Sequence, residues 1–552
     1  MHKSNPAYRA LERGGACISC RKRKVKCDGG RPACGRCSGI GRPMDCEYID
    51  ASGRTESEHL EASIANLERR ILQLGGTLPT SPEVVLHEPH VEGMPPGSSF
   101  SSWSSRNQNR SQDEPQIQIT LPDNWWKPAL PPRNVVKILM DLFARHASQF
   151  GFFLNGPRIM NSVFSPDPAR PISPSLLNSI LLFGIHLSGS PPLQARETEY
   201  LNRAARSVAP IQPYQVTQNI QGEVLLAQYF LRQGRFLESM HRINTAASLA
   251  IGCGLHRLPG PHSAKNAYAL PPTHDAVEQG ERVNAFWMIV GLHKIFSVLM
   301  QWPSSVSDIL DEQIDLPWPL DMEVYESGIV PINPHRQFTM KTFLDDPMAA
   351  NSEAANSAPA QYAKAAALFE RASHTGGNRT NLSDPEEYAQ FILFEHGLTQ
   401  IIQTLPSPDT VQGPIDAIRQ RLVTFTLCQV AVIQLHSAFD NPPSIVKCLN
   451  AARAVVSVNQ RIPNMQIWQY IDSTMGTLWV AVCQIIIRGI ATIKNPRGST
   501  RGWIASVSKA DYPALKSALA SMTNTMQIFS PRCPLIDYQL NRVQESYRTL
   551  CG

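Results

Sequence analysis

Six of the twelve cysteines in this 552-residue chain lie within its first fifty residues. They follow the spacing C-x2-C-x6-C-x6-C-x2-C-x8-C, at Cys17, Cys20, Cys27, Cys34, Cys37 and Cys46. Residues Met1 to Pro6 contain no apolar signal segment, so we expect a reducing compartment. Clustered thiols there indicate metal binding rather than disulfides, and two C-x2-C pairs favour zinc.

The number of cysteines constrains the metal site. One tetrahedral zinc takes four thiolates, so six cysteines are too many for a single ion. Two zinc ions need eight coordination positions, which six cysteines supply if two of them bridge, and the spacing is nearly two-fold repeated. The alternatives are one four-cysteine zinc with two spare cysteines, or an iron–sulfur site, which has no use for neighbouring basic residues.

A basic run lies between the second and third cysteines. Its charged members are Arg21, Lys22, Arg23, Lys24 and Lys26. The first fifty residues carry a net charge of +6 and the whole chain +5, so the module holds essentially all of the net positive charge. A nuclear localisation signal or a solvated face could also produce such a run. Neither explains its position between metal ligands, and we expect a module that binds nucleic acid.

The segment from Cys17 to Asp28 resembles the first half of the fungal zinc binuclear cluster DNA-binding domain. The segment from Arg31 to Cys37, which includes the loop residue Pro32, resembles the second half. This resemblance implies that Cys17 and Cys34 bridge two zinc ions.

The same resemblance implies how double-stranded DNA is contacted from a short helix after Cys20. Lys24 and then Arg23 are expected to read bases of a CGG-type half-site in the major groove. Arg21, Lys22 and Lys26 are expected to contact phosphates, which position the protein without specifying sequence.

A short dimerisation helix is predicted directly behind the module. Thr55 and Glu58 fit a capping box, and Gly75-Gly76 provides a helix end. The apolar positions between them follow a heptad pattern, at Leu60, Ile64, Leu67, Ile71 and Leu74. Isoleucine at a and leucine at d favour a parallel two-stranded coiled coil. Since one triplet carries too little information for a genome, we expect a homodimer; the alternative is an amphipathic helix packed on its own chain.

The remaining organisation follows from composition. We expect the zinc module at 13–50, a link at 51–55, the coiled coil at 56–75, a Pro/Ser-rich disordered linker at 76–132, and a large all-α regulatory domain at 133–552. Trp125-Trp126 is expected to dock onto that domain.

Helical signals dominate the regulatory domain. Val224–Leu231 and Phe236–Ala250 end at glycines and predict an antiparallel pair. Glu281–Trp302 and Met475–Ile493 are interrupted by charged or polar residues, so we expect buried helices and no membrane span. Residues 219–320 resemble the middle homology region of fungal transcription factors, except that the usual acidic-basic pair is here His293-Lys294.

No nucleophile elbow or Walker loop occurs, so we expect no enzyme. The chain is predicted to be a DNA-binding regulator of RNA polymerase II transcription with co-regulators or the transcription machinery as partners. The alternative is a helical ligand-binding or enzymatic protein whose zinc module serves structure or protein contact.

Overall fold

The computed structural model describes residues 15–31, 33–40, 46–48, 121–168, 170–206, 212–257, 270–301, 313–328, 339–346, 356–377, 385–410, 414–462 and 465–551. The chain divides into two compact units, Met1–Glu88 and Pro89–Gly552. In these described ranges all regular elements are helical, and the β-type pairing of Arg257 with Asp315 is an isolated bridge. A small cysteine module followed by a large all-α domain is therefore confirmed.

The described residues of the small unit form two five-residue helices, α1 (Ile18–Lys22) and α2 (Gly35–Gly39). The predicted dimerisation helix, with Leu60, Ile64, Leu67, Ile71 and Leu74, lies outside the described residues. The same is true of the linker as far as residue 120.

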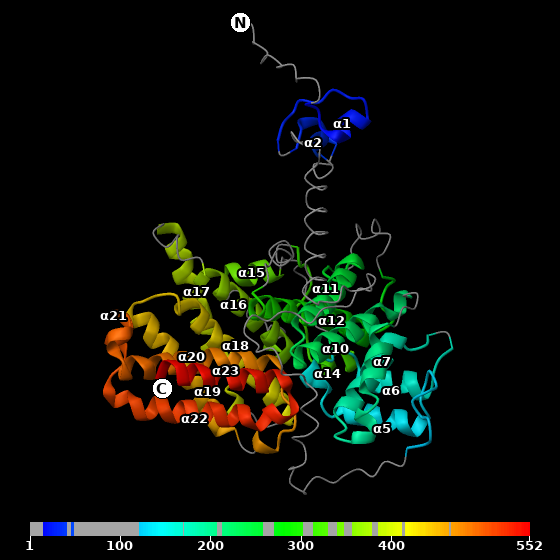
Figure 1. The fold of residues 1–552 in the computed structure, drawn as a ribbon. Helices are drawn as coiled ribbons and strands as arrows, with labels where there is room; N and C mark the ends of the chain where they lie inside the picture. Colours follow the sequence, from blue (N-terminus) through cyan, green and yellow to red (C-terminus); the bar gives the residue numbers. More distant parts are fainter. Residues whose placement is uncertain are drawn as a thin grey trace, which may run out of the picture. The chain divides into compact units, whose positions relative to one another are not determined.

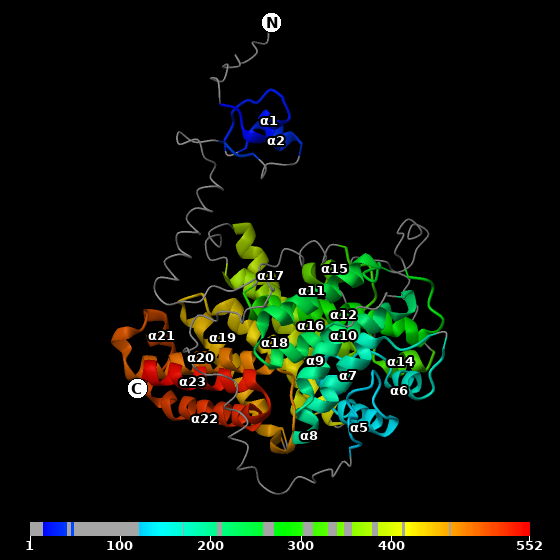
Figure 2. The same ribbon diagram turned by 45° about the vertical axis from the view of Figure 1, so that its right-hand side comes forward.

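The helical unit runs from one side to the other in chain order (Figures 1 and 2). Its first part holds α5 (Arg133–Ala144), η4 (Ala147–Phe150), α6 (Gly156–Phe164), α7 (Pro174–His186), α8 (Pro191–Gln194), α9 (Glu197–Ala205), η5 (Pro213–Gln215), α10 (Val216–Arg232), α11 (Phe236–Gly252) and α12 (Ala276–Leu299). The middle holds α14 (Met322–Glu326), α15 (Thr339–Asp345), α16 (Ala358–Gly377) and α17 (Pro385–Thr404).

The last part holds η8 (Pro408–Thr410), α18 (Ile415–His436), α19 (Pro442–Arg461), η9 (Met465–Ile467), α20 (Thr474–Lys494), η10 (Pro496–Gly498), α21 (Arg501–Ser506), η11 (Lys509–Asp511), α22 (Tyr512–Phe529), η12 (Ser530–Arg532) and α23 (Pro534–Cys551). Helix α16 packs on both α12 and α18, and so joins the first part to the last (Figure 1).

The predicted antiparallel pair is present as α10 and α11. Gly234, at a φ of 73°, ends α10, and the N–H of Arg235 donates to the carbonyl of Phe230 at 2.9 Å. Gly254, at a φ of 76°, ends α11 in the same way. Glycine adopts this left-handed conformation without a steric penalty, so it closes both helices. The hydroxyl of Ser239 then joins the pair by donating to the carbonyl of Ala227 at 2.8 Å.

The domain begins before residue 133. Trp125 is buried and stacks on Tyr200 of α9, with ring centroids 5.9 Å apart. The guanidinium of Arg196 lies over the ring of Trp126 at 3.5 Å, and Arg203 donates to the Trp126 carbonyl. Residues 121–128 are thus packed on the domain, as expected for the tryptophan pair.

Helix α20 is long and apolar enough to cross a membrane by length and composition alone. In this fold 67% of its apolar window is buried by other helices of the same unit. Trp479, in the second turn of α20, is fully buried and stacks on Phe529 of α22. The helix has the burial that is typical of a core helix.

His293 and Lys294, which replace the usual pair, both lie in the core. The ammonium of Lys294 is 2% exposed and pairs with the Glu370 carboxylate of α16. The Ser297 hydroxyl donates to the same carboxylate at 3.3 Å. The partner of Lys294 is therefore supplied by another helix, 76 residues away in sequence.

Candidate metal centre

The metal-binding module is built from two similar halves. Cys17 is the N-cap of α1, and its sulfur accepts from the backbone N–H of Cys20 at 3.4 Å. Cys34 is the N-cap of α2, and its sulfur accepts from the N–H of Cys37 at 3.3 Å. Each C-x2-C pair thus forms the first turn of a short helix. The N–H of Ile18 also donates to the Glu47 carbonyl at 2.8 Å, which ties the start of α1 to the segment after Cys46.

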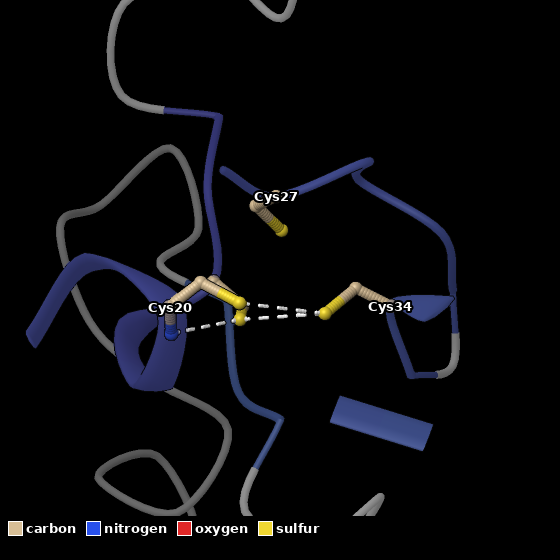
Figure 3. Close-up of side chains that lie close together, drawn as sticks. Cys20, Cys27 and Cys34 are labelled. Atoms are coloured by element: carbon tan, nitrogen blue, oxygen red, sulfur yellow. Dashed lines mark hydrogen bonds between the residues drawn. The ribbon is translucent and has the colours of Figure 1, made fainter. Parts of the chain in front are cut away.

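The six cysteine sulfurs lie close together. They form two groups of four, and two cysteines belong to both groups. One group contains Cys17, Cys20, Cys27 and Cys34, and the other contains Cys17, Cys34, Cys37 and Cys46. Figure 3 shows Cys20, Cys27 and Cys34 pointing toward one another. All six cysteines are buried, and the two groups share Cys17 and Cys34. These are the two residues expected to bridge.

The sulfur separations fit zinc. The sulfur of Cys34 lies 3.9 Å from that of Cys17 and 3.6 Å from that of Cys20. A tetrahedral zinc with bonds of about 2.3 Å to sulfur requires neighbouring sulfurs about 3.8 Å apart. The printed separations within the two groups are therefore close to those that zinc would require. Zinc bound there would supply a fixed centre that holds the two halves together.

Protonation of the thiols depends on burial and on backbone donors. Burial raises the pKa of Cys20 to about 12 and that of Cys17 still further. Burial alone would also raise the pKa of Cys34, but donation from the Cys37 N–H and from neighbouring thiols lowers it. The pKa of Cys46 is lowered in the same way, through the Cys34 N–H at 3.2 Å. Backbone donation thus acts against burial at Cys34 and Cys46, and the thiolate is the form of cysteine that binds metal.

Two residues that the sequence reasoning did not select support the module. Both carboxylate oxygens of Asp28 accept from the Gly35 N–H at 3.0 Å, and a Cβ at Gly35 would lie 2.5 Å from one of them. The Tyr48 hydroxyl donates to the Gly30 carbonyl at 2.8 Å, and its ring packs against the cysteine cluster. The adjacency of Asp28 to Cys27 was the available signal for the first. No sequence signal indicated Tyr48, because its contacts depend on how the chain folds back onto the cysteine module.

Only part of the basic run lies on a helix. Helix α1 starts at Ile18 and contains only Arg21 and Lys22 of the run. Arg23 is its C-cap, and Lys24 follows in the left-handed region at a φ of 53°. The helix stops there because Val25 turns back to pack against the cluster. All five basic residues, including Lys26, are nevertheless exposed.

Two family models match the chain. Residues 15–55 match the fungal Zn(2)-Cys(6) binuclear cluster domain, and residues 140–408 match the fungal specific transcription factor domain. The chain belongs to the fungal zinc binuclear cluster transcription factors. The module of this family binds two zinc ions, in agreement with the two sulfur groups. Both matched families are transcription factor domains and not enzyme families.

Curated relatives extend over much of the transcription factor. The chain is 25% identical over 360 residues to the citrinin biosynthesis transcriptional activators of Monascus ruber and Monascus purpureus. These alignments cover 59% of this chain, 67% of the first relative and 59% of the second. The sorbicillinoid biosynthetic cluster transcription factor of Hypocrea jecorina is 52% identical over 42 residues, 8% of this chain and 6% of its own. No solved structure matches the chain.

Proposed function

We propose that this transcription factor binds CGG-type half-sites in the major groove as a homodimer and regulates RNA polymerase II transcription in the nucleus. The observation that carries the proposal is the position of the five exposed basic residues beside the metal-binding cysteines. A rigid cluster presents their charges in one fixed arrangement, and guanine O6 and N7 are acceptors suited to Lys and Arg. In this proposal Lys24 and Arg23 read bases, and Arg21, Lys22 and Lys26 contact phosphates.

Binding of the full chain to labelled duplexes tests this proposal. We expect tighter binding to a duplex with two CGG triplets than to a scrambled duplex of the same composition. Affinity should fall as the salt concentration rises. In a plot of the logarithm of the association constant against the logarithm of the salt concentration, each phosphate contact should contribute a slope of about −0.9. A chelator should abolish binding and added zinc should restore it, because such modules fold only with metal.

The alternative of a structural or protein-contact module predicts a different result. A zinc-loaded chain that binds both duplexes equally would contradict base reading. A chain that binds neither, while it retains its zinc, would instead favour that alternative.

The sign of regulation and the kind of target form a second part of the proposal. The Monascus relatives are named transcriptional activators of citrinin biosynthesis. We infer that this chain likewise activates genes of a biosynthetic pathway. Deletion of its gene should lower the transcripts whose promoters carry the selected sites, and an increase in those transcripts would contradict activation.

A further inference from the structure

The helical unit contains a cavity that the zinc module does not explain. It has a volume of about 160 Å³ and lies between α12, α16 and the loop from Phe152 to Leu154. Aromatic and apolar side chains form most of its wall, including Trp287, Met288 and Tyr362. A cavity of roughly 150 Å³ holds one benzene ring. The space therefore corresponds to a molecule of one-ring size.

A smaller pocket of about 40 Å³ continues this cavity. The two share Met288, Tyr362 and Gln420 in their walls. The smaller pocket adds polar side chains, among them Gln228 of α10 and Asp472. The combined space is apolar at one end and polar at the other, as small-molecule sites generally are.

Two amides in these walls have unused hydrogen-bonding atoms. Gln228 is 1% exposed, and neither its Oε1 nor its Nε2 has a hydrogen-bond partner among the described residues. The Nδ2 of Asn284 donates to the Leu320 carbonyl at 3.1 Å, but its buried Oδ1 has no partner there either. Buried polar groups of folded proteins are almost always paired, so these atoms indicate that something else pairs with them.

The charged residues in the walls of the two pockets restrict the kind of ligand that can bind there. None of the described residues that line either pocket is a lysine or an arginine. Two carboxyl groups, those of Asp321 and Asp472, line the walls instead. Burial raises the pKa of both carboxyl groups. Arg421 and Arg232 act on Asp321 and Asp472 but do not line the pockets, so an anionic ligand would meet these carboxyl groups without a cation in the described walls.

We propose that this cavity binds an uncharged, ring-sized molecule that donates hydrogen bonds, of the phenol class. The ring lies against Trp287 and Met288, and the hydroxyl donates to the Asn284 Oδ1. A polar substituent on a larger ligand reaches Gln228 through the smaller pocket. This site belongs to the helical unit and does not depend on the mode of DNA binding.

The walls of the cavity are held by contacts that need no ligand. The Gln221 side chain donates to the Gly151 carbonyl at 3.1 Å and accepts from the Phe153 N–H at 2.7 Å, which clamps the loop to α10. The Trp287 indole N–H donates to the Pro317 carbonyl at 2.7 Å, and its ring stacks on Trp318 with centroids 4.5 Å apart. A site held in this way loses little entropy when a ligand enters.

Nuclear magnetic resonance of the full chain with methyl-labelled methionine tests the proposal. The chain has fifteen methionines, and the Met288 signal is identified because it disappears in Met288→Leu. Phenol should shift the Met288 methyl resonance in a saturable way. The Met522 methyl, which is buried in α22, should not move. Benzoate, which is anionic, and toluene, which donates no hydrogen bond, should bind at least about tenfold more weakly than phenol.

A pair of variants provides the matched control. Phenol should raise the melting temperature of the wild-type chain. Met288→Phe places a larger side chain in the wall that both pockets share, so phenol should not raise the melting temperature of this variant. Met288→Leu conserves volume, and phenol should still raise its melting temperature. Saturable shifts confined to methionines that do not line the cavity, equal binding of phenol and benzoate, or no shift at all would each overturn the proposal. The last result would mean that water alone satisfies Gln228 and Asn284. The wild-type titrations decide the matter even if Met288→Phe does not fold.

Discussion

The backbone N–H of Lys24 donates to the carbonyl of Arg21 at 3.1 Å, while Lys24 itself has a φ of 53°. The next N–H, of Val25, donates to the Cys20 carbonyl at 3.1 Å. Together these bonds form a Schellman closure, in which the left-handed position is usually glycine. A side chain there costs about 1–2 kcal/mol. The presence of a lysine at this strained position is consistent with a function for its side chain.

Replacement of Lys24 separates strain from DNA reading. Lys24→Gly should stabilise the zinc-loaded module by about 1 kcal/mol, because glycine adopts the positive φ freely. Discrimination between CGG and scrambled duplexes should fall by about 1–3 kcal/mol. Zinc retention against a chelator and duplex titrations measure the two effects. Lys24→Ala is the control, since it removes the side chain but keeps the strain; an unchanged duplex ratio in both variants would refute base reading by Lys24.

Zinc content should differ between bridging and terminal cysteines. Cys17 belongs to both four-sulfur groups and Cys20 to one. Cys20→Ser should therefore retain about one zinc per chain, whereas Cys17→Ser should retain less, because each ion loses a thiolate. Elemental analysis after dialysis measures this. Cys253→Ser, in the helical unit, should keep both ions, and equal loss in the Cys17 and Cys20 variants would argue against bridging by Cys17.

Dimerisation is expected to depend on the heptad seam. Leu67→Glu places a charge at a d position and should make the full chain monomeric. Affinity for a duplex with two half-sites should fall by about a hundredfold, because the second contact loses its effective concentration. Affinity for a single half-site should change little. Light scattering and duplex titrations measure these outcomes, with Glu68→Gln as the neighbouring control; a dimeric Leu67→Glu chain would place the interface elsewhere.

The buried pair of Lys294 and Glu370 should respond differently to single and double replacement. Glu370→Gln leaves a buried ammonium without its carboxylate, so the free energy of unfolding should fall by about 3–5 kcal/mol. Lys294→Met should have a similar effect. The double variant Lys294→Met/Glu370→Leu should recover most of the loss, because neither charge of the pair remains to be left without its partner. Urea unfolding measures all three, and additive losses in the double variant would contradict this coupling.

Stability should decrease on mild acidification through His146. Burial, with the nearby Arg419 charge, lowers the pKa of His146 to about 4, from 6.5 in the unfolded chain. Between these two values the unfolded state takes up a proton that the folded state does not, so stability falls as the pH drops from 7 to 4. His146→Gln should reduce the loss of melting temperature over that range. His241→Gln, on the exposed surface of α11, serves as control, and identical pH profiles for wild type and His146→Gln would exclude this contribution.

Local signals predicted the elements whose causes are local. The positive-φ glycines Gly234 and Gly254 end α10 and α11 where the pattern placed the ends. Five of the six cysteines outside the module are buried, and Cys253 is half-buried. The resemblance implied a short helix near Cys20, but the end of α1 at Lys22 depends on the turn of Val25 toward the cysteine cluster.

Contacts between distant segments could not be predicted in this way. The apolar stretch of α20 is compatible with a membrane or a core, and burial against α22 and α23 makes it a core helix. Lys294 gave no sign of its partner Glu370. The cavity depends on Asn284, Gln228 and Asp472, which three separate segments bring to adjoining walls.

The sequence by itself determined the metal chemistry, because six thiols within thirty residues have few ways to satisfy zinc and the basic residues lie between them. The tertiary structure decided which sulfurs share a tetrahedron, that Lys24 leaves the helix in a left-handed turn, and that unpaired amides line a cavity in the helical unit. The physical reason is the distance along the chain between the residues that interact. Coordination and helix ends depend on neighbours in sequence, whereas burial, buried ion pairs and cavities depend on the packing of the whole chain.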